Sequence, residues 1–419
     1  MRTLIFALVL SAGLGAAQSQ EASPSIAGVV RQLEMGQKSV RVVCFGDSIT
    51  GVYYHTGSRR AWTDLLGLAI QKAWPSAKVE MVNAGISGNT TAQGLARMER
   101  DVNAKRPDLV AVMFGMNDVV RTPVETYEAN LRQISARCRR AGAAVIFCTP
   151  NSVTETPDRP NAKLAEFSEA MRRVAAGEGW PVADAFADWE SLRKRDFGAW
   201  TLLMSETIHP NLNGHRRFAE LMASTLSGKA IELADSEVGF DPDPIPLTRS
   251  RLEAGEPVKI VAMPPYDQWF PELARNHFPN ARLEVLTWPV TPASAASKGG
   301  DPWSSGGREA AKGFAKTIRN LKPNLVVVAP PAWINANATD AEFVADAQWM
   351  LNLAFPFGRS EWEVLALLPE VANPEAPGKA SRIESWKRMM LGKDLVPVAR
   401  KNGERLPGRE LIDEALFGR

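Results

Sequence analysis

The sequence predicts an α/β fold built on parallel sheets, with helices covering both faces of each sheet. Two observations support this prediction. Short apolar runs typical of buried strands alternate with longer segments in which apolar residues recur at helical spacing. A second series of similar runs follows a segment that is rich in proline and charge. Strands that are apolar along their whole length are typical of parallel sheets, so the chain is expected to form two such arrangements of helix and sheet.

The first half of the chain contains an ordered alternation of expected strands and helices. Thr122 and Glu125 have the spacing of a capping box at the start of one helix, and Gly142 fits its end. Helices between consecutive strands are the crossovers that parallel pairing requires. The strands are expected over residues 41–46, 78–85, 108–115, 143–150 and 181–187, and the helices over residues 62–74, 91–104, 122–142, 162–179 and 214–226.

The second half of the chain looks like a divergent copy of the first. Residues 229–257 lack periodicity and are rich in proline and charge, so they are expected to form a linker. The shared order of four segments favours a duplication over the alternative of two unrelated sheets. The segments that line up are 259–268 with 41–50, 278–288 with 74–84, 321–333 with 105–117, and 364–369 with 145–150.

The composition is that of a globular protein without an unusual charge. The chain has 419 residues, of which 45% are hydrophobic, and its formal net charge is +2. This length suits two domains, and the small net charge gives no indication of a nucleic-acid partner. After the amino-terminal apolar run, no segment is apolar enough to predict a membrane span. The oligomeric state is left open.

The first residues have the pattern of a signal peptide. Arg2 gives a positive start, residues 3–10 form an apolar run, and the small residues 15–17 match a cleavage site after Ala17. The alternative, a membrane anchor, is disfavoured because the run is too short to span a bilayer. We therefore expect an exported protein, either periplasmic or extracellular.

Three cysteines, Cys44, Cys138 and Cys148, stand in apolar or helical surroundings. Their odd number argues against a disulfide framework, and small buried side chains are expected instead. A bridge between Cys44 and Cys148 is the alternative, provided that their strands are neighbours. No spacing of cysteine and histidine resembles a metal site, so no metal is expected.

Polar residues gather where the strands of the first half end. Ser48 follows the first strand, Gly88 the second and Asn117 the third, and His209 precedes the last helix. Because the carboxyl ends of parallel strands share one edge of a sheet, these residues are expected to converge. Acyl transfer by serine needs a hydroxyl, a base, a carboxylate that orients the base, and donors for an oxyanion. Ser48 can supply the hydroxyl, His209 the base, and Glu206 the carboxylate.

The same stretches carry a family resemblance. GDSIT with Ser48, SGNT with Gly88, GMND with Asn117 and IHPN with His209 resemble the four blocks of the SGNH, or GDSL-type, hydrolases. The match covers roughly residues 40–226, and the blocks occur in the family's order. The resemblance implies a three-layer α/β/α, flavodoxin-like fold and a serine ester hydrolase without a cofactor. It implies Ser48 as nucleophile and His209 as base. It also implies an oxyanion hole made by the N–H groups of Ser48 and Gly88 with the Asn117 amide.

One position departs from the family pattern, which has an aspartate three residues before the histidine. Glu206 stands there in this chain. Glutamate is one methylene longer and orients the histidine in some α/β-hydrolases, so Glu206 is expected to orient His209. The alternative is that Glu206 faces solvent and that Ser48 and His209 act as a dyad.

Residues near the nucleophile are candidates for substrate binding. Tyr53, His55 and Asp47 lie within a few residues of Ser48. A structural role in the loop is an equal alternative for Tyr53 and His55, and Asp47 has the alternative of holding the turn. His215 opens the last helix and is expected to make local hydrogen bonds at the helix start rather than to take part in catalysis.

The second half lacks the residues of the candidate site. Tyr266, Pro292 and Trp333 stand at the positions of the nucleophile and of the other two oxyanion donors, and proline has no N–H to donate. The tryptophans of this half are expected to pack in its core, with a sugar-binding surface as the alternative. The expected organisation is a signal peptide over residues 1–17, a catalytic SGNH domain over 25–228, a linker over 229–257 and a degenerate, non-catalytic SGNH-like domain over 258–419.

The sequence thus predicts a secreted serine esterase that works through an acyl-enzyme. Export and a polar loop with aromatic residues after Ser48 favour an O-acetylated carbohydrate as the ester substrate. A lysophospholipase or thioesterase is the nearest alternative, since the family includes such enzymes. A glycan-binding protein with two inactive halves is an alternative of another class, and the intact residues of the first half argue against it.

Overall fold

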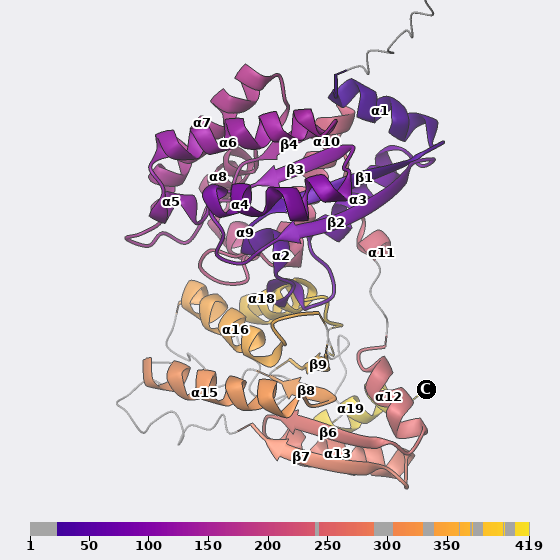
Figure 1. Cartoon of the computed structure of the whole chain (residues 1–419). Coiled ribbons are helices and arrows are strands. Elements are labelled where there is room, and N and C mark those ends of the chain that lie inside the picture. Colours follow the sequence, from indigo (N-terminus) through magenta and orange to yellow (C-terminus); the bar gives the residue numbers. More distant parts are fainter. Residues whose placement is uncertain are drawn as a thin grey trace, which may run out of the picture.

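The structure, a computed structural model, describes residues 23–238, 243–288, 305–329, 339–359, 361–368, 371, 380–396, 398 and 407–418. These residues form two units, each built on a parallel sheet (Figure 1). The expected signal peptide lies outside the described residues. Among the helices in the described ranges, none has the length and apolar character needed to cross a membrane.

The first sheet has five parallel strands in the order β2-β1-β3-β4-β5. Strands β3 and β4 are buried along their whole length, which explains their continuous apolar sequences. The last strand has only two residues because Asp184 caps a helix that begins at once, at Ala185. The predicted parallel α/β fold is confirmed. The strands are β1 (Ser39–Gly46), β2 (Lys78–Gly85), β3 (Leu109–Met113), β4 (Ala144–Cys148) and β5 (Val182–Ala183).

Two groups of helices cover the faces of this sheet (Figure 1). In one group, α10 packs against both α3 and α1, and in the other, α6 packs against both α4 and α7. The groups comprise α1 (Ile26–Met35), α3 (Trp62–Ala73) and α10 (Leu212–Ser227), and α4 (Thr91–Asp101), α6 (Val124–Arg140) and α7 (Asn161–Glu178). Shorter helices follow the strand ends: α2 (Ser48–Gly51), α5 (Asp118–Arg121), α8 (Ala185–Arg195), α9 (Phe197–Thr201), and the 3₁₀ turns at Tyr54–Thr56 and Asn103–Lys105.

The start of α6 differs from the prediction. The N–H of Thr122 donates to the carbonyl of Asp118 at 2.8 Å and closes α5. Helix α6 then begins at Val124 with Pro123 as its N-cap, without a side-chain cap. The capping box expected from Thr122 and Glu125 is therefore not formed.

The second sheet has four parallel strands in the order β7-β6-β8-β9. Its order and direction match those of β2-β1-β3-β4, and each of its strands overlaps one of the four segments that line up with the first half. A duplication is consistent with this match and stays a prediction. The strands are β6 (Pro257–Ala262), β7 (Arg282–Thr287), β8 (Leu325–Val328) and β9 (Glu363–Ala366). The helices are α13 (Tyr266–His277), α15 (Ser305–Leu321), α16 (Asp340–Ala354), α18 (Ala380–Leu391) and α19 (Gly408–Phe417).

The expected linker contains regular structure. Helix α11 (Asp235–Val238) is followed by α12 (Pro246–Glu253), which packs against β6. Pro246 fits the first turn of α12, where a missing N–H costs nothing. The buried Glu363 carboxylate accepts the next two N–H groups of that turn, each at 2.7 Å. Because Glu363 lies far from α12 in the sequence, local sequence patterns do not reveal this helix.

The buried residues form one hydrophobic core in each unit. Trp288, Trp362 and Trp386 are buried in the second core, which supports core packing over a sugar-binding surface for these three tryptophans. All three cysteines are buried and free, as expected. Cys44 on β1 and Cys148 on β4 are separated by β3, so the alternative disulfide is not formed.

Candidate active site

The candidate nucleophile lies on a tight turn at the carboxyl end of β1. Ser48 is the first residue of α2, and the side chain of Asp47 caps this helix by accepting the N–H of Ile49 at 3.0 Å. The turn needs a glycine before it, because a Cβ on Gly46 would lie 2.2 Å from Thr50 Oγ1 and 2.4 Å from the Met113 carbonyl. The strand end thus places the Ser48 hydroxyl at the edge of the sheet.

Ser48, His209 and Glu206 form a continuous chain of hydrogen bonds. Ser48 Oγ lies 2.8 Å from His209 Nε2, and His209 Nδ1 lies 2.5 Å from Glu206 Oε1. The side chains of His209 and Glu206 are each 17% exposed. This is the arrangement of hydroxyl, base and orienting carboxylate that acyl transfer by serine requires.

The loop around Glu206 folds back on itself, which brings the longer carboxylate to the histidine ring. Glu206 Oε1 accepts the backbone N–H groups of Ile208 at 3.2 Å and His209 at 2.8 Å. The Ser205 N–H donates to the His209 carbonyl at 2.8 Å. Burial raises the pKa of the Glu206 carboxyl, but the hydrogen bonds from His209 outweigh burial and bring this pKa below its ordinary value. Glu206 is therefore held as a carboxylate.

Two of the three expected oxyanion donors are the backbone N–H groups of Ser48 and Gly88, and the third is the Asn117 amide. Gly88 has a φ of +77°, and a Cβ there would meet nothing within 4 Å. In the described part of the chain, no hydrogen bond occupies the N–H of Ser48 or Gly88. Asn117 Nδ2 lies 3.1 Å from the Asn89 carbonyl and 3.4 Å from Asp47 Oδ2, so its amide is fixed beside the turn of the nucleophile.

Arg97 on α4 ties the strand ends of this site together. Its guanidinium donates to the carbonyls of Gly46 at 2.8 Å and Ala84 at 2.7 Å, and to Asn89 Oδ1 at 2.7 Å. These bonds join the end of β1, the end of β2 and the loop that carries Gly88. Arg97 thus links the strand end before Ser48 to the loop that carries Gly88.

Comparison with known proteins relates the part of the chain that forms this site to a family. The model of the GDSL-like lipase/acylhydrolase family matches residues 44–217. The thioesterase 1/protease 1/lysophospholipase L1 of Escherichia coli (strain K12) is 30% identical over 187 residues, which cover 44% of this chain and 82% of the relative.

The chain belongs to the GDSL-like lipase/acylhydrolase family. It is an ester hydrolase of the SGNH type.

Two further comparisons concern acetylxylan esterases. An acetylxylan esterase of Geobacillus stearothermophilus is 28% identical over 158 residues, which cover 35% of this chain and 71% of the relative. A crystal structure of an acetylxylan esterase from the same organism aligns with a TM-score of 0.39 and 24% identity. That alignment covers 48% of this chain and 95% of the solved chain.

The candidate substrate-binding residues of this SGNH hydrolase are buried and engaged with protein groups. Asp47 caps α2, and burial raises its pKa to about 7. Tyr53 accepts a hydrogen bond on its hydroxyl from Arg359 at 2.8 Å. His55 is 8% exposed, and its ring stacks on the His209 ring with centroids 4.0 Å apart and an angle of 8° between the planes. A role of Asp47, Tyr53 or His55 in substrate binding stays a prediction.

The neutral form of two buried histidines is favoured. Burial, followed by the charges of His209 and Lys393, holds the pKa of His55 well below its ordinary value. Burial lowers the pKa of His215 to about 3, and its Nδ1 accepts the N–H of Trp62 at 3.0 Å. His215 therefore has a hydrogen-bonding role, as expected, although its partner lies on α3 and not at its own helix start.

Three side chains of the site, His55, Glu206 and His209, could in principle hold a metal ion, because their ligand atoms lie within 4.8 Å of one another. Both ring nitrogens of His209 already have partners, Ser48 Oγ and Glu206 Oε1. The hydrogen-bonded chain accounts for this cluster, so we assign no metal to it.

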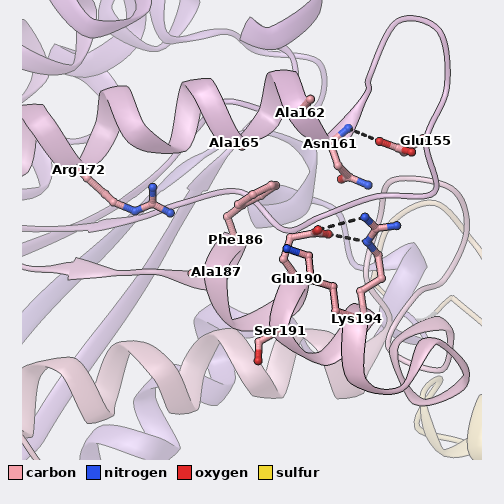
Figure 2. A pocket seen from close by; sticks show the side chains of 11 residues that line it. Glu155, Asn161, Ala162, Ala165, Arg172, Phe186, Ala187, Glu190, Ser191 and Lys194 are labelled. Carbon is pink, nitrogen blue, oxygen red and sulfur yellow. Dashed lines mark hydrogen bonds and ion pairs between the residues drawn. The ribbon is translucent and has the colours of Figure 1, made fainter.

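A surface pocket lies between α7 and α8. It has a volume of about 510 Å³ and is lined by Glu155, Arg172 and Phe186 among others (Figure 2). Arg172 pairs with Asp184 at 2.7 Å, and Arg193 pairs with Glu190 at 2.6 Å. Because these arginines are already paired, we assign no anion site to this pocket.

The structure also reveals residues that the sequence analysis missed. Lys393 and Asn352, from the second unit, reach Ser205 in the loop that carries Glu206 and His209. Lys393 is only 2% exposed although it is charged by type. The single sequence signal is a lysine within an apolar stretch, LGKDLVPV, and such a lysine reads equally well as a surface residue.

Proposed function

We propose that this protein is an exported serine esterase that removes O-acetyl groups from a carbohydrate through an acyl-enzyme on Ser48. The observation that carries the proposal is the chain of hydrogen bonds from Ser48 through His209 to Glu206, at 2.8 Å and 2.5 Å. The family relationship independently supports an ester hydrolase. The catalytic roles below are part of this proposal, and these contacts support those of Ser48, His209 and Glu206.

Acylation begins with the transfer of the Ser48 proton to His209 Nε2 as Ser48 Oγ attacks the acyl carbon. The carbonyl oxygen becomes an oxyanion, which the N–H groups of Ser48 and Gly88 and the Asn117 amide stabilise. The bond between the acyl carbon and the sugar oxygen then breaks. His209 returns its proton to that oxygen, and the alcohol leaves.

Deacylation repeats the sequence with water. His209 takes a proton from the water molecule as the water oxygen attacks the acyl carbon of the ester on Ser48. The oxyanion forms again at the same donors, the bond to Ser48 Oγ breaks, and Ser48 recovers its proton from His209. Acetate is released. Glu206 keeps the His209 ring oriented and stabilises the imidazolium in both steps.

The choice of a carbohydrate acetate rests on two considerations. A relative named acetylxylan esterase matches 35% of the chain. Near Ser48 the sequence has no long apolar segment that could cover a long acyl chain, which suits a small acyl group such as acetate. Export is supported by the signal pattern of residues 1–17.

The test compares the wild type with Ser48→Ala on p-nitrophenyl acetate and on acetylated xylan. We expect hydrolysis of both esters by the wild type, and a loss of about 10⁶-fold in kcat in Ser48→Ala, as for the nucleophile of other serine hydrolases. Equal rates for the two proteins would remove Ser48 from the reaction. Release of acetate from p-nitrophenyl acetate but not from acetylated xylan would argue against a carbohydrate acetate as the substrate.

A lysophospholipase or thioesterase activity is the second candidate. It is favoured by the relative named thioesterase 1/protease 1/lysophospholipase L1, which is 30% identical over 187 residues. A series of p-nitrophenyl esters from acetate to palmitate separates the two functions. A carbohydrate esterase should show its highest kcat/KM with acetate, whereas a rise toward long chains would favour the second candidate.

A further inference from the structure

We propose that the second unit of the chain supplies positioning residues for catalysis, namely Lys393 and Asn352, which clamp the two loops on either side of His209. This inference rests on the proposed serine mechanism and adds residues that lie far from it in the sequence. The second unit is then a working part of the active site although it carries no nucleophile.

Lys393 is placed where it can join these loops. Its Nζ donates to the His55 carbonyl at 2.7 Å, to Ser205 Oγ at 2.6 Å and to Asn352 Oδ1 at 2.5 Å. Burial lowers the pKa of Lys393 well below its ordinary value. An ammonium group has three N–H donors, and the three acceptors around Nζ suit that charged form. The side chain therefore bridges the backbone of the His55 loop and the side chain of Ser205.

Asn352 on α16 fixes the other side of Ser205. Its Nδ2 donates to the Ser205 carbonyl at 2.8 Å, and its Oδ1 lies 2.9 Å from Ser205 Oγ. The carbonyl contact defines which way the amide points. The carbonyl and the hydroxyl of Ser205 are thus both held by the second unit. On the same helix, Gln348 Nε2 donates to the carbonyls of Thr201 and Met204, at 3.0 Å and 2.5 Å.

Ser205 transmits this restraint to the catalytic residues. It directly precedes Glu206, and its N–H donates to the His209 carbonyl at 2.8 Å. Its Oγ also lies 3.0 Å from His55 Nδ1, and the His55 ring stacks on the His209 ring. The face of His209 and the start of its loop are therefore both supported by groups that Lys393 and Asn352 hold.

The position of the second unit in the fold fits this role. Helices α16 and α18 lie between the two sheets, against the end of the first unit that carries α2 (Figure 1). The Gly392 carbonyl, next to Lys393, accepts the N–H of Leu212 at the start of α10 at 2.8 Å. The second unit thus contacts the catalytic loop at Thr201, Met204, Ser205 and Leu212, on both sides of Glu206 and His209.

Such a clamp acts on kcat more than on binding. Serine attack needs the His209 ring aligned with Ser48 Oγ, and a small misplacement of a catalytic group can cost about a hundredfold in rate. Lys393 and Asn352 act through Ser205 and His55, so we expect their loss to lower kcat and to leave KM nearly unchanged.

The test uses the full-length chain and the variants Lys393→Met and Ser205→Ala. Lys259→Met and Ser381→Ala are matched controls at exposed positions of the second unit. Active sites are counted with a fluorescent phosphonate that labels Ser48, and kcat per labelled site and KM are measured on p-nitrophenyl acetate. We expect kcat per site to fall about tenfold to a hundredfold in both test variants. KM should stay within about twofold, and both controls should match the wild type.

A merely structural role would lower the labelled fraction and the melting temperature but leave kcat per labelled site unchanged, and that result overturns the inference. If Lys393→Met does not fold, Ser205→Ala decides alone, because it removes only one hydroxyl. Ser48→Ala distinguishes a failure of the serine mechanism from a failure of the role inferred for Lys393 and Asn352. Equal rates for wild type and Ser48→Ala overturn the serine mechanism and this inference together, whereas a Ser48-dependent wild type matched by Lys393→Met overturns this inference only.

Discussion

Glu206 shows how one residue can depart from a family pattern and keep its contacts. The extra methylene lets its carboxylate fold over its own loop, where Oε1 accepts two backbone N–H groups and faces His209 Nδ1. A solvent-facing glutamate, the alternative raised by the sequence, is not what the structure contains. The carboxylate is therefore available to select the histidine tautomer that leaves Nε2 free to accept the Ser48 proton.

Replacement of Glu206 tests this role directly. Glu206→Gln keeps the shape but removes the charge, so we expect kcat to fall about 10³-fold to 10⁴-fold, as when an orienting aspartate becomes asparagine in a serine protease. Glu206→Asp keeps the charge and should retain more activity than Glu206→Gln. Steady-state kinetics on p-nitrophenyl acetate measures both, and full activity of Glu206→Gln would remove the carboxylate from the mechanism.

At the scale of elements, most of what the sequence could predict about the site concerned the ends of the strands. The expected positions of Ser48, Gly88 and Asn117 depend only on where buried strands stop, and the structure has strands that stop there. The oxyanion role of these groups stays a prediction. Helix α12 was not predictable, because its cap comes from Glu363 in a distant strand. The capping box at Thr122 is not formed, because the Thr122 N–H already donates to the Asp118 carbonyl at the end of α5.

One buried histidine forms a hydrogen bond between α10 and α3. His215 on α10 accepts the N–H of Trp62 in the first turn of α3, at 3.0 Å. The folded protein takes up the His215 proton only near pH 3, whereas the ordinary pKa is 6.5. The neutral form therefore stabilises the fold fully above pH 6.5, and this contribution is lost as the pH falls from 6.5 toward 3.

His215→Asn should reduce this pH dependence. Asparagine offers a carbonyl oxygen near the position of Nδ1 and does not titrate. We expect the melting temperature of the wild type to fall more steeply between pH 6.5 and 4 than that of His215→Asn, since one buried site contributes up to about 1.4 kcal/mol per pH unit. His277→Asn, at a partly exposed histidine bonded to Asp413, is the control. Parallel pH curves for His215→Asn and wild type would contradict the assignment.

At the scale of the whole molecule, the backbones of the two units approach each other closely at Gly57. A Cβ on Gly57 would lie 1.8 Å from the carbonyl oxygen of Lys393, and Gly57 has a φ of +84°. This close approach belongs to neither unit alone. For the same reason the sequence could not predict the junction, because it depends on residues from two separate folding patterns.

Gly57→Ala should force the two units apart. Gly142→Ala is a matched control, because Gly142 has a similar φ of +79° and a Cβ there meets nothing within 4 Å. Both variants bear the strain of a left-handed alanine, about 1–2 kcal/mol, but only Gly57→Ala adds the clash. We expect a lower melting temperature and a lower kcat per phosphonate-labelled site in Gly57→Ala than in Gly142→Ala. Equal values for the two variants would show that the junction tolerates the extra methyl group.

The contacts of Lys393 also affect when the active site is completed during synthesis of the chain. Lys393 follows His55 by 338 residues, so a ribosome exposes Ser48, Glu206 and His209 long before it adds the lysine. A growing chain thus holds its nucleophile, base and carboxylate while the loop between α9 and α10 still lacks its restraint. Full kcat is then expected only late in synthesis, after α16, α18 and Lys393 have docked.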